Sequence, residues 1–167
     1  MDTLQNPRNT EWLAPEEMHE QSKRWFSELS FIKDEQQFLN NLIQSFSIKP
    51  IEVKEFALIN DFKMAIAENQ HRLIPILKQV QKHRNQLEIM LDSVNQHEME
   101  KAYKKTHENL YRKLNKYFLD YRTVKERGFA KLTHILKNTK KIALGNPEYR
   151  LSSTEQPKMP KPDFGEE

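Results

Sequence analysis

Apolar side chains recur at alternating spacings of three and four residues over three long stretches of the chain. This spacing is typical of a helix that packs in coiled-coil fashion. In the first stretch, about residues 14–47, the apolar seam contains Met18, Ser22, Trp25, Leu29, Ile32, Gln36, Leu39, Ile43 and Phe46, and we expect Phe26, Phe38 and Leu42 to widen it. Pro15, Glu16 and Glu17 suit the first turn, because proline has helical φ and carboxylates complement the helix dipole.

The second stretch, about residues 51–93, has the most regular pattern in the chain. Its seam contains Ile59, Phe62, Ile66, Asn69, Leu73, Ile76, Val80, His83, Leu87, Met90 and Val94. Pro50 ends the first helix, since proline cannot continue it. Pro75 lies inside the second pattern without disturbing its register, which predicts a kinked helix rather than two helices.

The third stretch, about residues 97–143, begins where Asn95 and Glu98 resemble a capping box. The seam that we predict for it contains Met99, Tyr103, Thr106, Leu110, Leu114, Tyr117, Tyr121, Val124, Gly128, Leu132, Ile135 and Ile142. Gly128 weakens such a helix by about 1 kcal/mol relative to alanine, and we expect it to allow close contact with another helix.

Together the three stretches predict an all-α fold, an elongated antiparallel bundle of three long helices over residues 14–144. Only three glycines occur, too few for the tight turns of a β fold, and 31% of the residues are charged, as suits long solvated helix faces. Residues 1–13 are expected to form an N-terminal arm. Residues 145–167 contain Pro157, Pro160 and Pro162 and are expected to be disordered.

The predicted helices differ in length, and this difference points to self-association. At 1.5 Å per residue the first is roughly 50 Å long and the others roughly 65 Å, so the hairpin between the second and third protrudes. Either the arm carrying Trp12 and Leu13 covers that hairpin, or a second copy does so in a dimer. The predicted self-association surface comprises Trp12, Leu13, Leu87, Met90, Val94, Met99 and Tyr103.

Features that would direct the chain out of the cytoplasm are not evident in the sequence. The N-terminus lacks a basic segment followed by an apolar one, and no apolar run approaches the roughly 20 residues of a membrane-spanning helix. There is no cysteine, so disulfides and thiolate metal sites are excluded. A cytoplasmic protein without a transmembrane segment is expected.

Catalytic and cofactor signatures are weak. Two Glu-x-x-His pairs, Glu16 with His19 and Glu68 with His71, have the spacing used by metal sites in helical bundles, but chance alone explains them among so many glutamates. No His-Glu dipeptide is followed by the second histidine of a zinc protease, and neither a glycine-rich phosphate loop nor a serine nucleophile elbow occurs. We therefore expect no enzyme activity and no cofactor, and keep a metal-binding protein as a third hypothesis.

Two polar residues, Asn69 and His83, fall on the seam of the second helix. Polar groups at such positions more often fix the helix register than bind a ligand. Folding about residue 95 brings His83 near the level of Glu108, which suggests a buried histidine–carboxylate hydrogen bond.

Charge is unevenly distributed along the chain. Residues 1–47 contain four basic and eight acidic side chains, whereas residues 98–141 contain thirteen basic and five acidic ones. A stripe of Lys101, Lys105, Arg112 and Lys116 lies opposite the third seam and has tyrosines nearby. Such a stripe suits a nucleic acid or an anionic membrane surface, but neutralisation by the acidic first helix is the simpler interpretation.

The leading hypothesis from the sequence is a non-enzymatic helical module that forms a homodimer and binds another protein. Binding of nucleic acid or anionic lipid through the third helix is the alternative.

Overall fold

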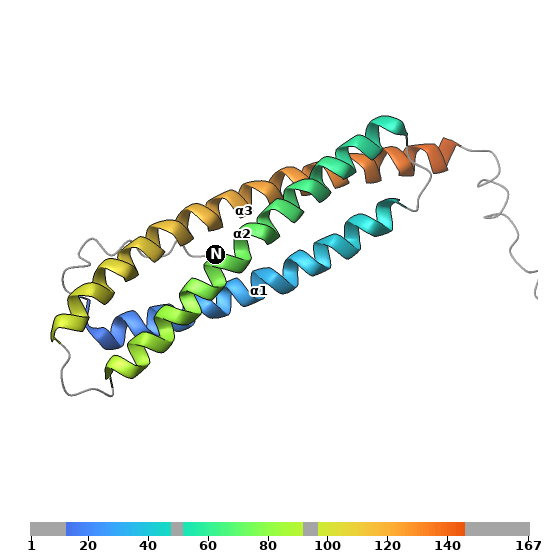
Figure 1. Ribbon diagram of the computed structural model, residues 1–167. Helices are drawn as coiled ribbons and strands as arrows, with labels where there is room; N and C mark the ends of the chain where they lie inside the picture. Colours follow the sequence, from blue (N-terminus) through green and yellow to red (C-terminus); the bar gives the residue numbers. More distant parts are fainter. Residues whose placement is uncertain (1–12, 48–51, 92–96, 146–167) are drawn as a thin grey trace, which may run out of the picture.

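The computed structural model describes residues 13–47, 52–91 and 97–145, which form three helices: α1 (Pro15–Ser47), α2 (Val53–Leu91) and α3 (His97–Gly145). Figure 1 shows them side by side along one long axis, each antiparallel to the next in the chain. The predicted all-α bundle is therefore confirmed, with helix ends within about two residues of the predicted ones. Most of the predicted arm and tail, residues 1–12 and 146–167, lies outside the described residues.

Local signals explain where the helices start and why α2 is continuous. Glu16 and Glu17 occupy the first turn of α1. At the start of α2 the Glu55 carboxylate accepts a hydrogen bond from the backbone N–H of Glu52 at 3.3 Å, one half of a capping box. As predicted, α2 does not end at Pro75, which is exposed on the solvent side of the helix.

The core is the line along which α2 meets both of its neighbours. α2 packs along α1 and along α3, whereas α1 and α3 touch only over a short stretch. The main apolar cluster extends through all three helices, from Trp25 on α1 to Ile135 on α3. The predicted seams of α1 and α2 are buried almost as expected, but Phe38 was wrongly assigned to the α1 seam, because 63% of its surface is exposed.

A second, smaller apolar cluster closes the end of the bundle near residue 91. It comprises Leu13, Met18, Leu87 and Met90, with Tyr103 packed against it. Leu13, just before α1, thus covers the α2–α3 hairpin end within a single chain. Of the two coverings that the sequence left open, the structure contains the one in which the segment before α1 folds back.

Gly128 lies where α3 approaches α2 most closely. A Cβ atom at this position would overlap the ring of Phe62, which is itself buried. The expectation that this glycine permits a close helix contact is confirmed.

We predict that Gly128→Ala destabilises the fold, although alanine is the better helix former by about 1 kcal/mol. Forcing a methyl group into a packed contact typically costs about 1–3 kcal/mol, which exceeds that gain. Urea denaturation followed by circular dichroism measures the change. The variant Phe62→Leu/Gly128→Ala should recover part of the loss, and a stabilised Gly128→Ala would contradict the account.

Candidate functional site

The residues predicted for self-association lie in different environments. Leu13, Leu87 and Met90 are buried in the end cluster of a single chain, and Tyr103 is half-buried against it. Met99 is 42% exposed. Trp12 and Val94 lie outside the described residues. The buried members therefore have no exposed surface to offer a second copy while the end of the bundle is closed.

The four weak metal candidates do not form a site. Glu16, Glu68 and His71 are exposed, whereas His19 is buried. In the described part of the chain there is no group of three or more histidine, aspartate or glutamate side chains that could hold a metal ion.

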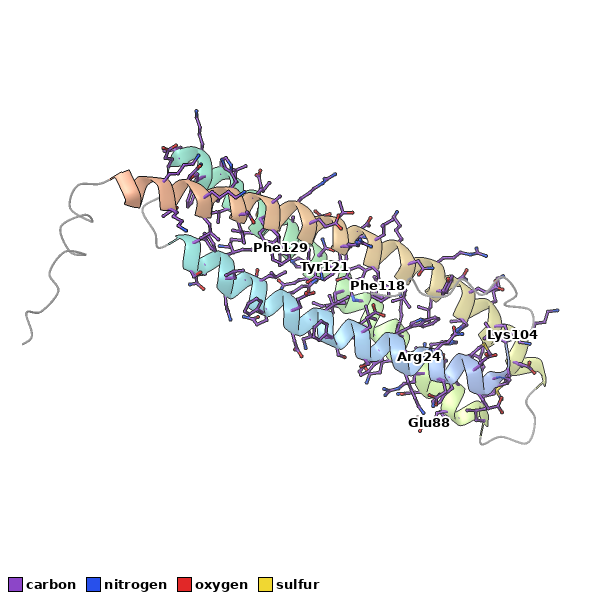
Figure 2. The ribbon with its side chains drawn as sticks, turned by 180° about the vertical axis from the view of Figure 1, so that it is seen from behind. Arg24, Glu88, Lys104, Phe118, Tyr121 and Phe129 are labelled. Carbon is purple, nitrogen blue, oxygen red and sulfur yellow. The ribbon has the colours of Figure 1, made fainter. Side chains whose placement is uncertain are left out.

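An apolar face that the sequence pattern did not predict lies where α1 and α3 border each other. On α1, Phe31 and Phe38 flank Glu35, whose carboxylate contacts α3, so this side of α1 faces α3. On α3, Phe129 lies one turn from Lys125, which contacts α1. Figure 2 shows Phe118, Tyr121 and Phe129 on the side of α3 toward α1.

We call this surface the α1–α3 face and define it by its exposed members, Phe31, Phe38, Phe129 and Leu136. Phe31 and Phe38 are 61% and 63% exposed, and the two α3 residues are 44% and 47% exposed. The half-buried Phe118 and Leu42 adjoin it and pack against the main core. Clustered apolar side chains of this size on a surface commonly mark a binding site.

A polar cluster holds α1 to α3 in the middle of this face. The Tyr121 hydroxyl donates to Glu35 Oε2 at 2.8 Å, and Lys125 Nζ lies 3.0 Å from both oxygens of the same carboxylate. Burial, with the adjacent Glu35 carboxylate, raises the pKa of the Tyr121 hydroxyl, which therefore stays protonated and donates. One turn away along α1, Gln36 donates from Nε2 to the Tyr117 hydroxyl at 3.1 Å.

The predicted basic stripe points away from α1. Lys101, Lys105, Arg112 and Lys116 are all exposed on α3. The ion pair between α3 and α1 involves Lys125 instead, and Arg112 is 3.8 Å from Glu108 of its own helix. Within the described ranges, Lys101, Lys105 and Lys116 have no ion-pair partner. Neutralisation of the stripe by α1, the favoured interpretation of the sequence, is therefore wrong.

The buried polar contact of His83 is with a histidine and not, as expected, with Glu108. His83 Nε2 lies 3.0 Å from His107 Nδ1, and His107 Nε2 lies 3.1 Å from Gln21 Oε1. The His107 ring also stacks on Trp25, with centroids 4.4 Å apart. This chain of contacts, which we call the histidine relay, connects α2, α3 and α1.

The sequence pattern missed His107 because it placed Thr106 on the seam of α3. Thr106 is exposed and His107 is 1% exposed. The available signal was the spacing from Tyr103 to His107 to Leu110, four and then three residues, which fits the seam as well as Thr106 does.

Burial keeps both histidines neutral at ordinary pH. Removal from water lowers the pKa of His83 to about 4. Burial, with the neighbouring His83 ring, lowers the pKa of His107 to about 3. Both values lie well below the usual value near 6.5.

Two surface hollows adjoin these elements. One, of about 430 Å³, lies between α2 and α3 and is bordered by His83, Tyr103, Lys82 and Lys113. The other, of about 530 Å³, lies between α1 and α2 beside Ile74 and Leu77. The described linings contain no nucleophile paired with a base, so nothing in them assigns a reaction.

The described helices include none that is long and apolar enough to cross a membrane. Comparison of the chain with protein-family models, with curated proteins and with solved structures gives no match. The argument for function therefore rests on the surfaces and contacts described above.

We predict that acid lowers the free energy of unfolding through the relay. The unfolded chain binds protons on both histidines below pH 6.5, and the folded chain does not until about pH 4 and 3, so stability is complete above pH 6.5 and is lost as the pH falls. The slope approaches about 1.4 kcal/mol per pH unit for each histidine. Urea denaturation at several pH values measures it, and His71→Gln, at an exposed histidine, should leave the slope unchanged.

Proposed function

We propose that this protein is a non-enzymatic interaction module that forms a homodimer through the α1–α3 face. The observation that supports this proposal most directly is that four large apolar side chains, Phe31, Phe38, Phe129 and Leu136, are exposed on facing sides of two helices. Burial of apolar surface from water is the main driving force of protein association. A docked helix pair would bury them and complete a four-helix layer.

Charge complementarity favours a second copy as the occupant of the face. α1 carries six acidic and three basic side chains, whereas α3 carries thirteen basic and five acidic ones. In a two-fold dimer the α1 of one copy lies on the α3 of the other, because the same surface of each chain meets itself across the axis. Acidic α1 then meets basic α3 twice.

The double variant Phe38→Glu/Phe129→Glu tests the proposal. Both side chains are largely solvent-exposed, so the fold should survive, whereas charge at the centre of the interface should weaken the dimer at least about a hundredfold. Light scattering and sedimentation over a range of concentrations measure the mass.

The matched control is Phe56→Glu/Met64→Glu, at two residues of similar exposure on α2. It should dimerise like the unchanged chain. A monomeric unchanged chain at all concentrations, or a dimer that tolerates the α1–α3 variant, would contradict the proposal.

A second candidate function is binding of an anionic partner through the basic stripe. It is favoured by one specific observation, that Lys101, Lys105 and Lys116 are exposed without ion-pair partners among the described residues. Lysines presented in this way can contact the phosphates of nucleic acid or of lipid headgroups. The stripe lies on the side of α3 away from α1, so both proposed surfaces can be occupied together.

We expect binding to a 20-base-pair duplex or to vesicles with anionic lipid to weaken steeply with salt. Replacing the four stripe residues by glutamine should remove most of the affinity and reduce the salt dependence, by about one counterion for each lost phosphate contact. The control makes the same change at four exposed lysines elsewhere, Lys33, Lys54, Lys63 and Lys78. Equal losses in both variants would show that only net charge matters and would dispose of the stripe.

A further inference from the structure

The histidine relay has a defined order of donors and acceptors. Gln21 Oε1 can only accept, so His107 Nε2 carries the proton between them. Neutral His107 then accepts at Nδ1, so His83 Nε2 carries the proton of the next contact. The remaining ring nitrogen, His83 Nδ1, is an unprotonated acceptor, and it is buried without a hydrogen-bond partner in the described part of the chain.

A proton that enters this relay is not stabilised. On His83 it would occupy Nδ1, which has no acceptor nearby. On His107 it would occupy Nδ1 and turn the 3.0 Å contact with the His83 N–H into a contact between two donors. A buried positive charge without a partner is costly, so acid favours any state in which the rings reach water.

Other titratable groups around the relay do not compensate. On α2 and α3, Lys82, Tyr103 and Lys113 border the same hollow as His83, and the two lysines add positive charge. On α1 the contacts are the uncharged Gln21 and Trp25, with Glu28 one turn further along. Tyr111 packs on the far side of Trp25, and His19 is buried at the same end of α1.

We propose that the histidine relay is an acid-sensitive latch that holds the first third of α1, residues 15–25, on the α2–α3 hairpin. Its position gives it this role, because Gln21 and Trp25 are the α1 side of the relay and Met18 lies one turn before Gln21. When the latch opens, Leu13 and Met18 leave Leu87 and Met90, and the apolar end of the hairpin becomes exposed.

The remainder of α1 is held by contacts that acid does not break in the same range. Leu29, Ile32 and Leu39 are buried in the main core, and Gln36 is bonded to Tyr117. Opening is therefore local: residues 15–25 detach from the hairpin, whereas residues 32–43 stay packed. This inference does not depend on the α1–α3 face, which lies further along α1.

Hydrogen exchange followed by mass spectrometry at pH 7.5 and pH 5.0 tests the latch, with rates expressed as protection factors. Each histidine that becomes accessible favours the open state by about thirtyfold at pH 5.0, which gives about a thousandfold for the pair. We expect protection of residues 15–25 to fall by about two to three powers of ten, and protection of residues 32–43 to stay within a fewfold.

The double variant His83→Gln/His107→Gln cannot take up the protons and should show little change between the two pH values. Each single variant should keep about a thirtyfold response, which serves if the double variant does not fold. His71→Gln and His19→Gln should behave like the unchanged chain. Uniform loss of protection along α1, no loss at pH 5.0, or a full response in the double variant would overturn the proposal.

Discussion

The buried seam of α2, which comprises eleven residues from Glu55 to Met90, packs against two helices at once. Most of the architecture follows from this double contact, because α1 and α3 each bury their apolar seam mainly against α2 and touch each other only briefly. Two outer helices that share one central partner leave their own border incompletely covered. The exposed phenylalanines of the α1–α3 face lie along that border.

Buried polar groups determine how the helices are aligned along this seam. Gln36, Tyr117 and the backbone oxygen of Asn69 connect the three helices in the middle of the bundle, and His83, His107 and Gln21 connect them near one end. In the described chain several of these groups retain an unused atom, among them Gln36 Oε1 and His83 Nδ1. Such atoms lower stability, but they penalise a slipped register, in which the remaining partners would be lost as well. The relay adds sensitivity to protons to this structural role.

The sequence predicted the helices, their order and nearly all of the α1 and α2 seams, because spacing of three and four residues reports directly which side of a helix is buried. It did not predict the position of α1 relative to α3. Phe38 was assigned to the core since it is apolar and adjacent to Leu39, yet the two outer helices diverge enough to expose it. His107 and Thr106 fit the pattern equally well, and only the packed partner, Trp25, decides between them. The orientation of the basic stripe likewise depends on the rotation of α3 in the bundle.

The central claim is that the α1–α3 face becomes covered when two copies meet. The most direct measurement is ¹⁹F NMR of the chain labelled with fluorophenylalanine, with solvent exposure of each ring read from the shift between H₂O and D₂O over a range of protein concentrations. The account predicts that Phe31, Phe38 and Phe129 lose solvent exposure together as concentration rises, whereas Phe56 on α2 stays exposed. Unchanged exposure of the three rings at every concentration would contradict it.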